Sequence, residues 1–157
     1  MLASPLYNFV FWRMRAPAAY RDFASGYFEA IFRAYQNPRL MERHLADIEA
    51  LIVHVRSLGA KPVFVILPFP SMWQDQSFVP HGVSRTFLHE LRNKVYNSVA
   101  SKVRALGAPL IEAQVVEDEM TSQAFSINPM DAHPSNEAHR RIAEIISREF
   151  SKQRLLE

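Results

Sequence analysis

Two near-identical stretches, residues 55–60 (Val-Arg-Ser-Leu-Gly-Ala) and residues 103–108 (Val-Arg-Ala-Leu-Gly-Ala), most strongly constrain how this chain folds. Each ends a run of apolar residues at helical spacing and places a glycine shortly before an apolar segment, residues 62–67 and 109–113. The first of these segments reads Pro-Val-Phe-Val-Ile-Leu, which is typical of a strand buried on both faces. Two helix-then-strand units in series require right-handed crossovers and parallel strands, so the sequence predicts an α/β layered sheet.

The expected helices have recognisable start signals. Asn37 followed by Pro38 begins the first helix, and a last helix begins near Ser135 with Glu137 in its positively polarised first turn. The apolar positions at helical spacing are Leu45, Ile48, Ile52 and Val55 in the first helix, Leu88, Leu91, Val95, Val99, Val103 and Leu106 in the second, and Ile142, Ile145, Ile146 and Phe150 in the last.

Only two strands emerge from these patterns, although a strand that is apolar on both faces needs neighbours in its sheet. Residues 1–36 do not supply them, because their aromatic residues are spaced as one face of a helix. We expect this segment to be helical and to pack on the domain formed by residues 37–157. The alternative is an exposed aromatic face that binds a protein partner or a membrane surface.

The composition and charge of the chain exclude several classes of function. A chain of 157 residues is long enough for one domain with a substantial core, and the absence of cysteine excludes disulfides, thiol catalysis and cysteine-based zinc sites. Lys and Arg total 18 against 16 Asp and Glu, and the two signs are interspersed, which argues against nucleic-acid binding.

The sequence predicts no segment for membrane insertion or export. The longest apolar stretch, residues 63–79, is interrupted by Pro68, Pro70 and Asp75, so no transmembrane helix is expected. The first residues lack a basic region and a clear cleavage site. A chain that begins at Met1 is therefore expected in the cytoplasm.

The segment most suggestive of chemistry is residues 128–139, which follows the second strand as a loop and enters the last helix near Ser135. Loops at the carboxyl ends of parallel strands form the ligand crevice of open α/β sheets. Asp131 lies two residues before His133, so its carboxylate can orient the imidazole while the other ring nitrogen takes a proton from a hydroxyl nucleophile. A metal site built from Asp131, His133 and His139 is the alternative, but such a pair lacks further clustered ligands.

A second candidate region is the loop of residues 69–85, which leaves the carboxyl end of the first strand. Phe69, Trp73 and Phe78 are predicted to line the substrate crevice. Alternatively, these aromatic residues only anchor a long connection to the domain surface.

The chain resembles the SGNH (GDSL-type) hydrolases over roughly residues 40–150. The resemblance is carried by Asp-Ala-His-Pro-Ser-Asn at residues 131–136, followed by Ala138-His139 and Ile142-Ala143, where the family commonly reads Asp, His, Pro, Asn, then Gly-His and Ile-Ala. The preceding order of helices and strands also agrees with the second half of that family.

The resemblance implies a partial three-layer flavodoxin-like sandwich in which residues 37–157 are the C-terminal part of the hydrolase domain. It also implies that His133 is the base and Asp131 the acid of a Ser-His-Asp triad. The implied substrate is a small-molecule, carbohydrate or lipid ester, and neither a metal nor an organic cofactor is implied.

The Gly-Asp-Ser and Gly-x-Asn-Asp blocks of that family, which supply the nucleophile and part of the oxyanion hole, do not occur in this chain. The missing blocks and the missing strands belong to the same upstream region of the family, so we interpret the chain as a fragment of a longer protein. The sequence does not indicate the cellular compartment of that longer protein. The isolated chain is then expected to be inactive. The competing hypothesis is a non-catalytic α/β domain that binds a partner or membrane through its aromatic N-terminal face.

Overall fold

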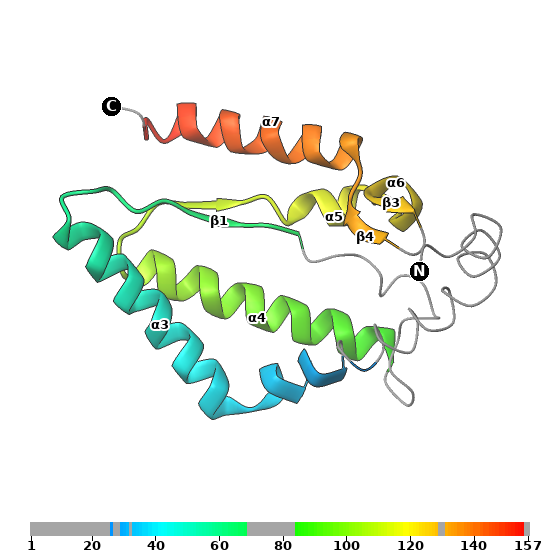
Figure 1. The fold of residues 1–157 in the computed structure, drawn as a ribbon, viewed down its shortest axis with the longest axis horizontal. Helices are drawn as coiled ribbons and strands as arrows, with labels where there is room; N and C mark the ends of the chain where they lie inside the picture. The colour runs from blue at the N-terminus through cyan, green and yellow to red at the C-terminus, as the bar shows by residue number, and fades with distance from the viewer. Residues whose placement is uncertain (1–25, 27–28, 32, 69–83, 129–130, 156–157) are drawn as a thin grey trace, which may run out of the picture.

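The computed structural model describes residue 26 and residues 29–31, 33–68, 84–128 and 131–155 (Figure 1). Residues 29–31 and 33–36 are helical, and the rest of the fold consists, in chain order, of α3 (Pro38–Ser57), β1 (Phe64–Ile66), α4 (Arg85–Ala105), β2 (Leu110–Glu112), α5 (Val115–Glu119), α6 (Ser122–Phe125), β3 (Ser126–Asn128), β4 (Asp131–Pro134) and α7 (Asn136–Lys152). No helix within these described ranges is long and apolar enough to cross a membrane.

The repeated hexapeptide forms the same helix end twice. Gly59 N–H donates to Arg56 C=O (2.9 Å) and Ala60 N–H donates to Val55 C=O (3.2 Å), and the second copy repeats both bonds at the same lengths. These two bonds define a Schellman motif, which needs a residue at positive φ after the helix. Gly59 (φ +76°) and Gly107 (φ +63°) meet that need without the strain that a side chain would introduce. The repeat therefore ends α3 and α4 and turns the chain into β1 and β2.

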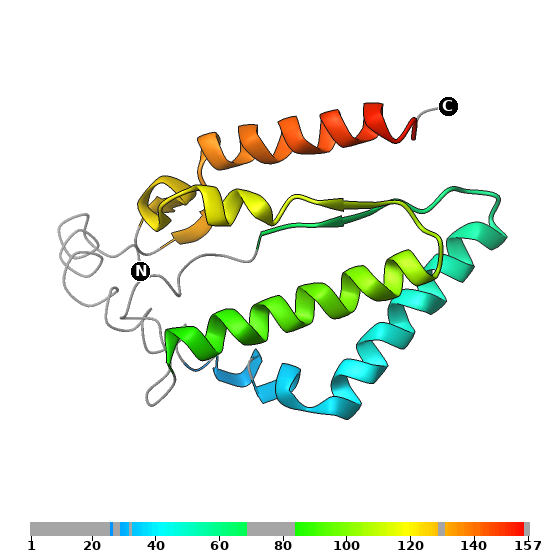
Figure 2. The same ribbon diagram turned by 180° about the vertical axis from the view of Figure 1, so that it is seen from behind.

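β1 and β2 pair in parallel, with Phe64 opposite Leu110 and Ile66 opposite Glu112. Both views of the molecule place α7 on one side of this strand pair and α3 and α4 on the other (Figures 1 and 2). The prediction of an α/β fold with parallel strands is confirmed. The described residues do not form the predicted three-layer sandwich, because their parallel sheet has only two strands and most of them are helical.

Two separate clusters of buried side chains hold the helices to the strands. Phe64 packs against the cluster beneath α3 and α4, whereas the next residue, Val65, packs against the cluster beneath α7. Successive residues of a strand point to opposite faces, so β1 joins both clusters. The buried residues are Ile48, Ile52, Val103 and Ala108 in the first cluster, and Ala113, Val116, Met120, Phe125, Ala138 and Ile142 in the second.

The chain between β2 and α7 differs from the expectation. The stretch that leads into the last helix at Ser135 was expected to be a loop, but β4 occupies Asp131–Pro134 and pairs antiparallel with β3. The short helices α5 and α6 were not expected either. The predicted start of the last helix is confirmed, because Ser135 is the N-cap of α7.

Candidate active site

The elements between β2 and α7 gather at the end of the molecule where β1 and β2 finish (Figures 1 and 2). The β3–β4 hairpin, α5, α6 and the first turn of α7 all lie at this end, while the C-terminus lies at the other. The carboxyl ends of parallel strands are where open α/β sheets bind ligands. The Asp131 and His133 pair is thus placed at the end of the sheet that the sequence indicated.

Both residues of the pair belong to β4, and His133 is exposed to solvent. Ser126 pairs with Pro134 and Asn128 pairs with Asp131. The two pairs are two residues apart along β3 but three residues apart along β4. β4 therefore has one extra residue between Asp131 and Pro134, which is the arrangement of a β-bulge. Bulges redirect side chains and are common beside active sites, so the irregularity falls where the proposed acid and base must be aimed.

Ser135 fixes the junction between β4 and α7. Its N–H donates to Phe125 C=O (2.6 Å) and its Oγ donates to Ala124 C=O (2.6 Å), which ties the junction to α6. Ser135 Oγ also accepts from Ala138 N–H (3.2 Å) as the N-cap of α7. This one residue satisfies a free N–H group of the helix and holds the chain two residues after His133 in place.

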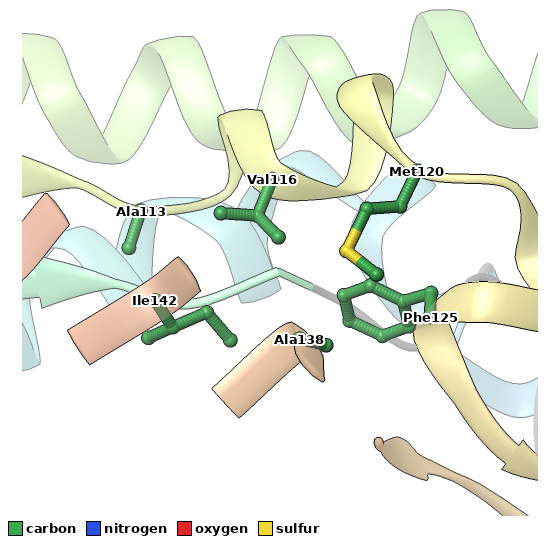
Figure 3. Close-up of a cluster of buried hydrophobic side chains, with 6 residues drawn as sticks. All are labelled: Ala113, Val116, Met120, Phe125, Ala138 and Ile142. Atoms are coloured by element: carbon green, nitrogen blue, oxygen red, sulfur yellow. The ribbon is translucent and has the colours of Figure 1, made fainter. Parts of the chain in front are cut away.

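A cluster of buried apolar side chains packs beside the same junction. Figure 3 shows the side chains of Met120 and Phe125 next to each other, in one cluster with Val116 of α5 and with Ala138 and Ile142 of α7. Phe125 and Ala138 are both fully buried. The hairpin that carries His133 is consequently anchored to a packed core through the residue directly before β3.

Glu137, the acidic residue in the first turn of α7, forms ion pairs with two arginines. Glu137 accepts from Arg140 Nε (2.9 Å) and Nη2 (2.7 Å) and from Arg141 Nε (2.9 Å), while Arg140 also pairs with Glu144. The hydrogen bonds from Arg140 and Arg141 lower the pKa of Glu137 to about 2. A carboxyl with this pKa is ionised at neutral pH, so Glu137 is excluded as a general acid there.

An ion pair that the sequence patterns did not reveal links α4 to α5 at this end of the sheet. Arg92 Nη2 lies 3.0 Å from Asp118 Oδ1, and only 7% of the Arg92 side chain is exposed, against 64% for Asp118. The Arg92 guanidinium also lies 5.9 Å from the centre of the Tyr96 ring, within cation–π range. One signal was present, since Arg92 stands on the buried stripe of α4, four residues after Leu88 and three before Val95.

The other predicted site features have different outcomes. Phe69, Trp73 and Phe78 lie outside the described residues, so their role as a substrate wall stays a prediction. His139 is exposed on α7, and no group of three potential metal ligands occurs within the described ranges. Gln114, two residues after β2, has a buried Oε1 that accepts no hydrogen bond from the described part of the chain.

Comparisons with protein-family models, with curated proteins and with solved structures found no match for this chain.

Proposed function

We propose that this chain supplies the acid and the base of a Ser-His-Asp triad in an esterase or acyl hydrolase, with the serine provided by polypeptide outside the 157 residues. One observation carries the proposal: Asp131 and His133 lie on a bulged strand at the carboxyl end of a parallel sheet, directly before the capped start of α7. The resemblance of residues 131–143 to the final block of the SGNH hydrolases supports the same assignment.

In this proposal His133 is the general base. The exposure of His133 permits contact with a serine from another segment. Asp131 would accept a hydrogen bond from one ring nitrogen, fix the tautomer and stabilise the imidazolium after the other nitrogen has taken the serine proton. His133 would then return that proton to the leaving alcohol when the ester bond breaks.

Rigid support distinguishes this pair from an incidental Asp and His on a surface loop. A catalytic base must be held within fractions of an ångström of its productive position, which requires fixed neighbours. The two 2.6 Å hydrogen bonds of Ser135 and the fully buried Phe125 provide such neighbours on the side of α6 and α7. The nucleophile would need similar support from a larger sheet, so we infer that β1 and β2 belong to a flavodoxin-like sandwich in the assembled protein.

The test measures the hydrolysis of a simple aryl acetate by the longest protein that is translated from the reading frame encoding this chain. His133→Ala and Asp131→Asn should each lower kcat by roughly 10⁴-fold, because removing a triad member leaves only binding and the oxyanion hole. His139→Ala is the matched control, since His139 is also exposed and lies six residues downstream. Equal loss in the His133 and His139 variants, or no loss in either, would show that His133 is not the base.

A further inference from the structure

We draw no further inference here: the strongest candidate, the exposed apolar face that Leu40, Leu51 and Leu58 form at helical spacing along α3 and its C-cap, carries no proposal because nothing in the part of the chain that the structure describes shows what covers it.

Discussion

Replacing Ser135 with alanine removes two hydrogen bonds from the junction that holds β4 against α6 and α7. Loss of the N-cap bond to Ala138 N–H costs about 1 kcal/mol of stability. Loss of the bond from Ser135 Oγ to Ala124 C=O, which is 2.6 Å long, costs about 1 kcal/mol more, which is the net contribution of a typical hydrogen bond. Ser135→Ala should therefore lower the free energy of unfolding by about 2 kcal/mol.

A matched control isolates the second bond. Ser84 is the N-cap of α4 and accepts from Phe87 N–H (3.1 Å), so Ser84→Ala removes a cap alone and should cost about 1 kcal/mol. Ser135→Asp keeps a capping acceptor but has no donor for Ala124 C=O, and should also cost about 1 kcal/mol. Ser135→Thr keeps both groups and should be close to the wild type.

Urea denaturation followed by circular dichroism measures these differences. With a slope of about 2 kcal/mol per molar urea, the Ser135→Ala midpoint should fall by about 1 M, twice the shift for Ser84→Ala. If the two alanine variants shift equally, or Ser135→Asp matches the wild type, the bond to Ala124 does not stabilise the junction.

Three further predictions concern the same end of the molecule. Phe125→Ala should destabilise the chain by roughly 3–5 kcal/mol, because the ring is fully buried, and a urea midpoint within error of the wild type would contradict this packing. Asp118→Ala should cost about 1 kcal/mol in the same assay, because the mostly buried Arg92 loses an ion partner that is itself largely solvated, and Arg92→Met in that background should recover part of the loss. The pKa of Glu137, about 2 against an ordinary 4.5, means that its ion pairs stabilise the fold above pH 4.5 and are lost as the pH falls toward 2. The urea midpoints of wild type and Glu137→Gln should therefore differ at pH 6 and converge at pH 2, and a difference that is unchanged by acid would be inconsistent with this assignment.

The parts of the fold that were predictable from the sequence are those specified by local chemistry. Gly59 and Gly107 follow their helices at positive φ, as a Schellman motif requires, and Asn37 and Ser135 are N-caps that bond to their own helices. These signals act within six residues of the chain, so both ends of α3, the end of α4 and the start of α7 were predicted close to their observed positions.

The region between β2 and α7 was less predictable because its elements are too short to show periodicity. α5 has five residues and α6 has four, which is about one helical turn each. β4 has an irregular register, it ends at Pro134, and another proline stands two residues before it at position 129, a pattern typical of a loop.

Within the candidate site, the sequence identified the Asp131 and His133 pair but not what surrounds it. The bond from Ser135 to Ala124 joins residues 11 positions apart, and the pair of Arg92 and Asp118 joins residues 26 positions apart. Contacts at such separations depend on the tertiary fold, and no spacing rule along the chain reveals them.

The central claim is that His133 activates a serine, and labelling with a fluorophosphonate tests it most directly, because that reagent reacts with serines whose hydroxyl is activated by a neighbouring base. The longest product of the reading frame should be labelled at one serine, as mass spectrometry of its peptides would identify. His133→Ala should abolish that labelling, His139→Ala should leave it unchanged, and the 157-residue chain alone should not be labelled. Labelling of the same serine at the wild-type rate in His133→Ala would contradict the proposed function.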